Sequence, residues 1–322
     1  MELENAKVAF DLIKEHKDNK LKKFLDENLS FDPNIKDELG NTLIFYAVNN
    51  NKPTIVNKLL NMEITIDYLD NDKRNLLYYP IKFKFSNILT KLVERNNELI
   101  GINLIDIKDR YGFTSLHYSV MFNNFEAFKK LIKYSDNLNI LDFEGNTFLH
   151  LAAKKNRYKF IELSKNYDVN FNLQNNEGYS ALHYAVKETA IDSIKQLLDF
   201  DLNLYTNKKQ ETPLFFSTKQ PEITKLLLDK GANINHQDIM GNTFIHNIID
   251  RNELKDEEKF LFNYNIDFTL INIDGETISH LYLKNSGNYF IKIFLKNASF
   301  LIQDNKGNTV LHYLLMNYNW KD

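Results

Sequence analysis

The sequence repeats itself at an interval of 33 residues, and this interval constrains the fold more than any other feature. Three glycines mark it, each at the fourth place of a turn that opens with Asp or Asn: Gly112, Gly145 and Gly178. A period of this size is typical of solenoids, in which each unit packs only on its neighbours. The sequence therefore predicts a stack of similar units, although 322 residues would usually suggest two globular domains.

The clearest unit, Asp142–Lys154, carries a pattern that resembles the first half of the ankyrin repeat. The matching residues are Asp142, Gly145, Thr147, Leu149, His150, Ala152 and Ala153. The second half is matched in another copy by Leu226, Leu227, Gly231, Ala232, Asn233, Ile234 and Asn235. The resemblance implies an all-α ankyrin-repeat solenoid of helix-turn-helix units with β-turn fingertips. The local chemistry agrees, because Gly permits the positive φ of a tight turn and Thr at the sixth place is a good N-cap.

The resemblance also divides the chain. We expect residues 1–36 to form an N-terminal helical cap and residues 37–322 to form the array. The repeats start near residues 37, 70, 109, 142, 175, 207, 238, 272 and 304, and the last is incomplete. Repeat two is the most degenerate, and Pro80 falls inside its expected first helix, where it tends to kink or shorten the helix. An insertion is expected in Arg95–Asn103, because insertions in repeat proteins go to loops. Pro213 alone takes the family's Pro place, so we expect the other helix starts to be less rigid.

Six histidines take the ninth place in successive repeats, and a structural role is favoured over catalysis. Equivalent atoms in stacked repeats lie about 10 Å apart, whereas a metal ligand must reach within ~2 Å. The resemblance implies that each imidazole bonds to the hydroxyl residue and turn of its own repeat. The positions in this structural motif are Thr114, His117, Thr147, His150, Ser180, His183, Thr243, His246, Thr309 and His312. No phosphate-binding, dinucleotide, zinc-protease or nucleophile-elbow motif occurs. We therefore predict no enzyme, no cofactor and no metal.

Composition narrows the function classes further. The chain has no cysteine, which excludes disulfides, thiolate metal sites and cysteine nucleophiles. A formal net charge of −3 gives no overall basic field for nucleic acid. No segment approaches the ~18 apolar residues of a membrane span, and the first residues do not resemble a signal peptide. We expect a cytoplasmic protein, or one in the host cytosol if it is an effector, without nucleic-acid partners or membrane insertion. Abundant Asn, Lys, Ile, Phe and Tyr indicate an AT-rich genome.

One group of residues stands out as a candidate binding surface. Ankyrin proteins generally bind through fingertip places two, three and five and inner-helix places thirteen and fourteen, and in most repeats of this chain those places are polar. Repeat three and its neighbours differ, and the candidate partner-binding residues are Arg110, Tyr111, Phe113, Met121, Phe122, Phe143 and Tyr179. Arg with large aromatic residues is typical of an interface hot spot. The alternative is that these side chains pack on one another. Ile239 and Met240 form a weaker second candidate.

We predict a non-catalytic scaffold or adaptor that binds another protein on its concave face, centred on repeats three to five. The alternative is a recognition arm of a larger enzyme or membrane protein, or a host-directed effector, whose active part lies beyond residue 322. Terminal repeats normally become polar, but the last one here is apolar, which leaves further chain, self-association through this end or fraying open. The apolar residues are Leu311, Leu314, Leu315, Tyr318 and Trp320. Asn170 and Asn235 lie in short contexts that resemble those of hydroxylated ankyrin asparagines, and their modification also stays open.

Overall fold

The computed structural model describes residues 2–98, 103–206, 208–251, 256–285 and 290–317. These residues form two compact units. Unit 1 comprises the described residues up to Ala152 together with Lys159–Asn170, and unit 2 comprises Ala153–Tyr158 together with the described residues from Phe171 onward. Some sequence-based expectations lie outside the described residues: the start of repeat six at Asn207, positions 99–102 of the expected insertion, and the terminal Tyr318 and Trp320.

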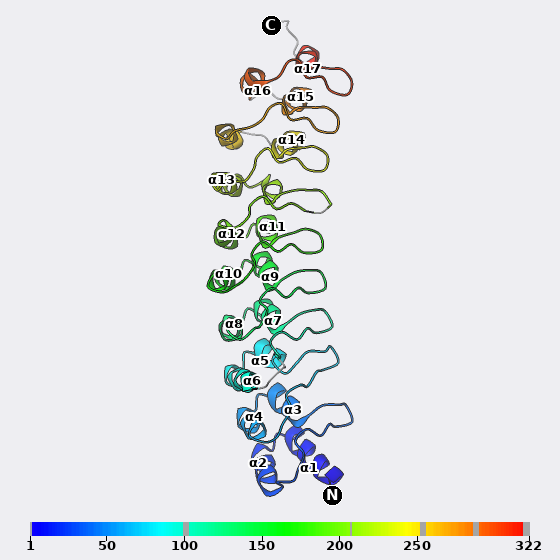
Figure 1. The fold of residues 1–322 in the computed structure, drawn as a ribbon, viewed down its shortest axis with the longest axis vertical. Helices are drawn as coiled ribbons and strands as arrows, with labels where there is room; N and C mark the ends of the chain where they lie inside the picture. The colour runs from blue at the N-terminus through cyan, green and yellow to red at the C-terminus, as the bar shows by residue number, and fades with distance from the viewer. Residues whose placement is uncertain (1, 99–102, 207, 252–255, 286–289, 318–322) are drawn as a thin grey trace. The chain divides into compact units, whose positions relative to one another are not determined.

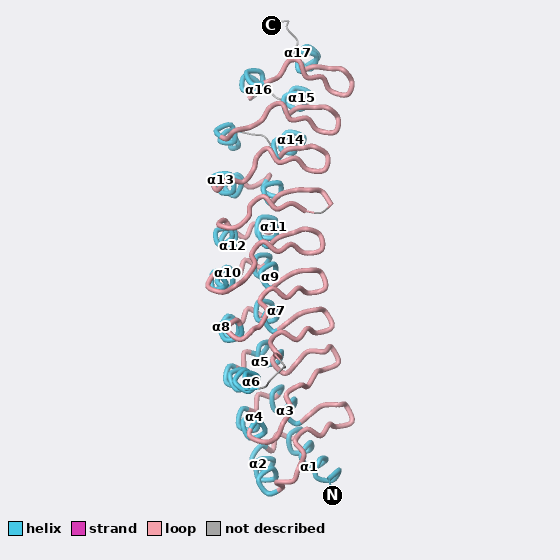
Figure 2. The backbone as a smooth tube through the Cα atoms, viewed as in Figure 1, coloured by secondary structure: helices cyan, strands magenta, loops and turns pink. Residues whose placement is uncertain are grey.

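Unit 1 is built from paired short helices joined by long turns. Its helices are α1 (Glu2–Lys14), α2 (Asp18–Glu27), α3 (Leu43–Asn49), α4 (Pro53–Leu60), α5 (Tyr78–Phe83), α6 (Ser86–Glu98), α7 (Ser115–Met121), α8 (Phe125–Leu131), most of α9 (Phe148–Lys154) and most of α10 (Tyr158–Ser164). The inner helices α3, α5 and α7 follow one another, and α4, α6 and α8 form a second, outer row (Figure 1). The turns project on the side of the inner row (Figure 2). Pro80 lies inside α5, as expected.

Unit 2 continues the same plan with two exceptions. Its helices are α11 (Ala181–Lys187), α12 (Ile191–Leu197), α13 (Pro221–Asp229), α14 (Phe244–Asp250), α15 (Ile278–Lys284), α16 (Ile291–Asn297) and α17 (Val310–Asn317). Two elements are 3₁₀ helices: η1 (Pro213–Ser217) in the inner row and η2 (Asp256–Asn263) in the outer row. Among the described residues the chain forms helices and isolated β-bridges but no extended strand, so both units are all-α and built from repeated helix pairs, as expected.

The turns of the repeats, apart from repeat six, whose first residue lies outside the described residues, are held by their first residue. In the third repeat, Oδ1 of Asp109 accepts the backbone N–H groups of Tyr111 and Phe113, both at 2.8 Å. Gly112 closes the turn at φ +83°, a conformation that glycine adopts without steric cost. Gln210 takes the same fourth place in repeat six at φ 57°, although a side chain disfavours that region.

Neighbouring turns within each unit are joined through the backbone. In unit 1, the Arg110 N–H donates to the Asp72 carbonyl at 2.9 Å, and the Phe143 N–H donates to the Tyr111 carbonyl at 3.3 Å. Unit 2 has equivalent bonds from Ile239 to Lys209, from Ile273 to Met240 and from Asn305 to Asp274, each at 2.9 Å. In each of these bonds, the backbone N–H of the residue at place two of one turn donates to the backbone carbonyl of the residue at place three of the preceding turn. The fingertips are therefore positioned by backbone atoms.

Apolar side chains at helical spacing stabilise the stack. Leu59 on α4, Leu92 on α6 and Leu131 on α8 are fully buried. Burying a side chain of this size contributes roughly 1.5–3 kcal/mol. Across the described ranges, no helix has both the length and the apolar character that a bilayer crossing requires.

Candidate partner-binding site

The buried histidines form a repeated hydrogen-bond network that fixes each inner helix to its turn. In the third repeat, Nδ1 of His117 accepts the Thr114 backbone N–H at 3.2 Å and lies 2.9 Å from Thr114 Oγ1. The opposite ring nitrogen, Nε2, lies 3.2 Å from the Asn146 carbonyl of the next repeat. Since Nδ1 accepts, the proton sits on Nε2, which donates to that carbonyl. The imidazole thus links two repeats as a neutral ring.

The same hydroxyl–imidazole contact recurs along the chain. Oγ to Nδ1 distances are 2.9 Å for Thr147–His150, Ser180–His183 and Thr309–His312, and 2.8 Å for Thr243–His246. Burial lowers the pKa of His117 and of His246 to about 4. Nδ1 accepts the backbone N–H of the threonine at the helix start. If Nδ1 were protonated, two N–H donors would face each other and this hydrogen bond would be lost. These imidazoles are suited to holding the fold, and among the described residues no group of three or more potential ligands is placed to hold a metal ion.

The third fingertip in unit 1 presents the most aromatic exposed surface among the sequence-predicted residues. Tyr111 is 53% exposed and Phe143, on the next fingertip, is 66% exposed. The two residues are joined by the backbone bond described above. An added Cβ on Gly112 would lie 2.7 Å from the Phe143 nitrogen, so the two fingertips are in close backbone contact. Tyr111 and Phe143 therefore sit side by side on a fixed base.

Arg110 is exposed but has a partner. Its Nη1 donates to Asp72 Oδ1 at 2.9 Å, and the two residues also share the backbone bond between their fingertips. An exposed ion pair of this kind contributes about 0–1 kcal/mol. The guanidinium is consequently held against the preceding fingertip, with part of its donor capacity already used.

The remaining predicted residues of repeat three are half-buried in an aromatic cluster. Phe122 stacks on Tyr118, with ring centroids 5.8 Å apart and planes 7° apart, and Phe113 meets the edge of Tyr118 at 5.8 Å. Tyr118 in turn contacts Tyr78 at 4.7 Å. Met121 is half-buried beside them. The sequence left open the alternative that these aromatic residues pack on one another. For Phe113 and Phe122 they do, around Tyr118.

Sequence reasoning missed the residue that organises this cluster, a tyrosine at the tenth place of the repeat. Tyr118 donates a short hydrogen bond to the Asp109 carboxylate at the base of its own fingertip. The same bond joins Tyr46 to Asp37 at 2.8 Å and Tyr79 to Asp70 at 2.7 Å. Burial, together with the adjacent carboxylate, raises the pKa values of Tyr79 and Tyr118. A tyrosine recurs nine residues after the first Asp of the turn in these three repeats, and this spacing could have indicated the hydrogen bond from the sequence.

A guanidinium that the sequence did not single out completes the cluster. Arg74 lies with its Cζ 4.3 Å from the ring centroid of Tyr78, and its Nε donates to Asp70 at 2.8 Å. Together with Phe113 and Tyr118, these side chains line a hollow of about 10 Å³, room for about one water molecule. The inner surface here is closed, and the exposed chemistry lies on the fingertips.

Tyr179 belongs to unit 2. Its ring is half-buried, contacts Tyr184 at 5.5 Å and His183 at 5.7 Å, and has the Lys187 ammonium 5.2 Å from its centroid. It therefore has its own aromatic and cationic surroundings within that unit.

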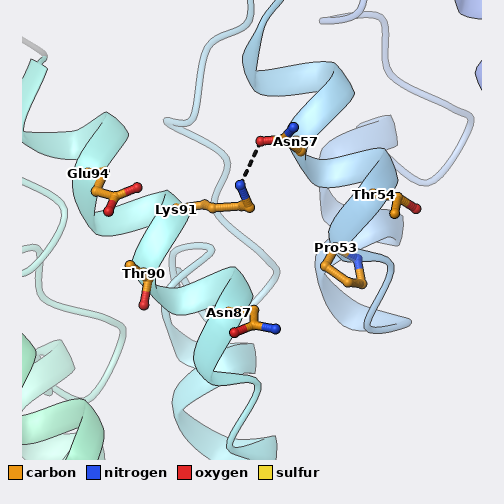
Figure 3. A pocket seen from close by; sticks show the side chains of 7 residues that line it. All are labelled: Pro53, Thr54, Asn57, Asn87, Thr90, Lys91 and Glu94. Atoms are coloured by element: carbon orange, nitrogen blue, oxygen red, sulfur yellow. Dashed lines mark hydrogen bonds between the residues drawn. The ribbon is translucent and has the colours of Figure 1, made fainter.

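A wider hollow in unit 1 lies elsewhere, between the outer helices α4 and α6. It has a volume of about 450 Å³ and an open, polar lining (Figure 3). Lys91 spans it by donating to Asn57 Oδ1 at 2.7 Å, and Glu94, Asn87, Thr54 and Thr90 make up most of the remainder. Ligand pockets are usually concave and mostly apolar, so this groove is a weaker candidate than the aromatic fingertips.

Comparison with known proteins gives one consistent result. A family model described as "Ankyrin repeats (3 copies)" matches residues 10–103, 97–171 and 159–238. Ankyrin repeat protein L371 of Acanthamoeba polyphaga mimivirus is 32% identical over 343 residues, covering 97% of this chain and 45% of that protein. Ankyrin repeat protein FPV034 of Fowlpox virus (strain NVSL) is 32% identical over 127 residues, covering 39% of this chain and 28% of that protein. The chain thus spans less than half the length of these curated relatives.

A solved structure supports the fold. The ankyrin repeat domain of Bcl-3, described as a unique member of the IkappaB protein family, superposes with a TM-score of 0.60 at 23% identity. The match covers 66% of this chain and 94% of that domain. Ankyrin repeats generally mediate protein–protein interaction and are typically non-catalytic. Because the family model covers more than half of the sequence, the chain belongs to the ankyrin repeat family.

Proposed function

We propose that this chain is a protein-binding scaffold or adaptor that captures its partner on the fingertips of repeats three and four in unit 1. The observation that carries the proposal is the pair Tyr111 and Phe143, two large aromatic side chains more than half exposed on adjacent fingertips. Tyr is enriched in binding hot spots, and exposed apolar patches mark interaction sites. The partner proposed is another protein, bound without catalysis.

Pre-organisation supports the same surface. The backbone bond between the two fingertips and the Asp109 turn fix where the aromatic side chains project. Binding then orders few additional groups, which lowers the entropic cost of association. Arg110, held by Asp72, adds a cation at the rim. Phe113 lies with its ring centroid 6.3 Å from that of Tyr111, and the half-buried Phe113, Met121 and Phe122 border the proposed contact surface.

The test begins with peptides selected from a random display library against the full chain, whose affinities are then measured by fluorescence. Tyr111→Ala with Phe143→Ala is expected to weaken binding by about 30-fold or more, because a hot-spot truncation costs at least ~2 kcal/mol. The matched control is Leu39→Ala, since Leu39 is 76% exposed on the fingertip of repeat one. Equal losses in both variants, or none in the double variant with an unchanged thermal melt, would exclude this site.

A second candidate role is the recognition arm of a longer protein acting inside an infected cell. It is favoured by the two viral relatives, of which this chain spans less than half. The exposed Leu311, Leu315 and Met316 of α17 support association with a further subunit through that helix. The mass of the native protein in its source cell, together with sedimentation of the purified chain, distinguishes a longer protein from a self-associating one.

A further inference from the structure

We propose that the inner face of unit 2 binds an extended acidic peptide segment whose acidic residues recur at about every third position. The surface is a row of cations at the C-terminal ends of successive inner helices. It consists of Lys154, Lys155, Lys187, Lys219, Arg251 and Lys284, all of them exposed. These residues are distinct from the fingertip site in unit 1, so either proposal can fail without the other.

The row is tied together within unit 2. The ammonium of Lys154 lies 5.3 Å from the centroid of the Tyr184 ring on the following inner helix, and Lys187 lies 5.2 Å from Tyr179. Contacts of this kind orient a cation over an aromatic face. Lys187 and Arg251 both interact electrostatically with the half-buried Glu211, which places them around one point. These contacts fix Lys154, Lys187 and Arg251 on the inner side of their repeats, and the other cations take the equivalent places in sequence.

Interaction with the helix dipole alone does not account for the row. A lysine at a helix C-terminus does interact favourably with the helix dipole. However, the inner helices α3 and α7 of unit 1 form with no basic residue in their last turn. Lys155, Lys219 and Arg251 lie beyond the ends of α9, η1 and α14. The repeat thus forms without a cation at this place, and the contacts that Lys154, Lys187, Arg251 and Lys284 make within the chain hold these cations without neutralising the whole row.

The spacing of the row defines the ligand. Packed helices lie about 8–10 Å apart, and an extended segment in the polyproline II conformation advances about 3.1 Å per residue with about three residues per turn, so that every third side chain lies on the same side. One step from repeat to repeat therefore corresponds to about three peptide residues. An acidic side chain at every third position would face one cation in each repeat.

The chemistry favours a peptide over nucleic acid. Glu188 and Asp250 are exposed within the strip, and Lys284 is already paired with Glu276 at 2.7 Å. These acids interrupt the uniform positive field that a phosphate backbone requires. A peptide, whose charges are separated by neutral residues, tolerates such interruptions.

The experiment uses the full chain and a labelled 12-residue peptide with Glu at positions 1, 4, 7 and 10 and Ser elsewhere. An isomer with its four Glu residues contiguous tests spacing, and a single-stranded oligonucleotide of equal charge tests generic anion binding. The spaced peptide is expected to bind more tightly than both. Binding should weaken as NaCl is raised from 50 to 500 mM, because exposed charges are screened.

Variants locate the surface. Lys154→Gln with Lys187→Gln and Lys219→Gln is expected to weaken peptide binding on the order of tenfold, since each exposed pair contributes about 1.4- to 5-fold. The matched control replaces exposed lysines of the outer helices α12, α13 and α16, namely Lys195→Gln, Lys225→Gln and Lys292→Gln. Tyr111→Ala with Phe143→Ala should leave this binding unchanged.

Three results would overturn the proposal. They are equal weakening by the inner and outer lysine variants, equal affinity for the contiguous isomer, and tighter binding of the oligonucleotide than of the spaced peptide. Thermal melts of each variant ensure that a loss of binding is not a loss of fold.

Discussion

The starts of two inner helices in unit 2, α14 and η1, follow the same sequence plan and reach different structures. At α14, Thr243 Oγ1 lies 2.8 Å from His246 Nδ1, which also accepts the Thr243 backbone N–H at 3.1 Å. At η1, Phe215 takes the histidine place, and the buried Thr212 Oγ1 has no hydrogen-bond partner among the described residues. The segment is a 3₁₀ helix even though Pro213 is the one proline in its family place. The proline alone therefore does not produce an α-helical start. In α3, Phe45 takes the histidine place, yet Thr42 Oγ1 accepts the Phe45 N–H at 3.3 Å and the segment is α-helical, so the engaged hydroxyl cap is what η1 lacks.

The largest expected effect comes from removing the imidazole at α14. His246→Phe leaves the buried Thr243 N–H without an acceptor and removes one of the two bonds to the Glu276 carbonyl, which still accepts the Asn272 N–H at 3.0 Å. The free energy of unfolding should fall by about 2–3 kcal/mol. Urea unfolding at pH 7 measures it. Phe215→Leu at the equivalent place of η1 is the control and should cost less than ~1.5 kcal/mol, because no hydrogen bond is lost. A cost for His246→Phe no greater than that of the control would contradict the comparison.

Lowering the pH should reduce the stability that His246 contributes at α14, whereas η1 has no histidine at the equivalent place. Burial lowers the folded-state pKa of His246 to about 4, against an unfolded value near 6.5. The unfolded state therefore takes up the proton first, so this contribution is complete above about pH 6.5 and falls as the pH decreases toward 4. Between pH 7 and pH 5 the loss should be about 2 kcal/mol for this group. Urea titrations at both pH values should show a shallower pH dependence for His246→Phe, and an unchanged slope would exclude His246 as the source.

One substitution should have different consequences at the two sites. Thr243→Val removes a hydroxyl that caps its helix and should cost about 1–2 kcal/mol. Thr212→Val removes a buried hydroxyl without a partner and should be neutral, within about 0.5 kcal/mol, or stabilising. Parallel thermal and urea melts of the two variants check this. Similar losses in both would show that Thr212 is satisfied in solution.

The smallest expected effect comes from the turns that precede η1 and α14, which differ in the residue at the fourth place. Gln210 occupies the fourth place of repeat six at φ 57°, where Gly241 occupies that of repeat seven at φ 73°. Gln210→Gly should stabilise the protein by about 1 kcal/mol by relieving a left-handed conformation. Gly241→Gln should destabilise it, since an added Cβ would lie 3.0 Å from Asn272 Cα. A destabilised Gln210→Gly variant in urea titration would mean that its side chain makes compensating contacts.

Local chemistry made much of the fold predictable. The positions of Gly112 and Thr114 indicated a turn and a helix start from short-range rules, and α7 begins directly after that threonine. The 3₁₀ form of η1 was not predictable from Pro213, because proline suits the first turn of an α-helix and the sequence does not show that the Thr212 hydroxyl makes no cap bond. Repeat boundaries and the partner-binding residues stay predictions.

The site was less predictable because exposure depends on neighbouring repeats. Places two, three and five indicated Tyr111 and Phe143, and both are exposed. Nothing local to Phe122 indicated that its ring would stack on Tyr118, and Asp72 lies 38 residues before its partner Arg110. Contacts between repeats are set by the register of the stack, which the composition of one repeat does not encode.

The backbone bonds between fingertips have a consequence for how such a protein changes over generations. Because the Phe143 N–H and the Tyr111 carbonyl make the connection, the side chains at those places carry none of it. A substitution there alters the surface that a partner meets and leaves the supporting framework intact. Recognition can therefore diversify one residue at a time, without the destabilisation that ordinarily limits which mutations a lineage retains.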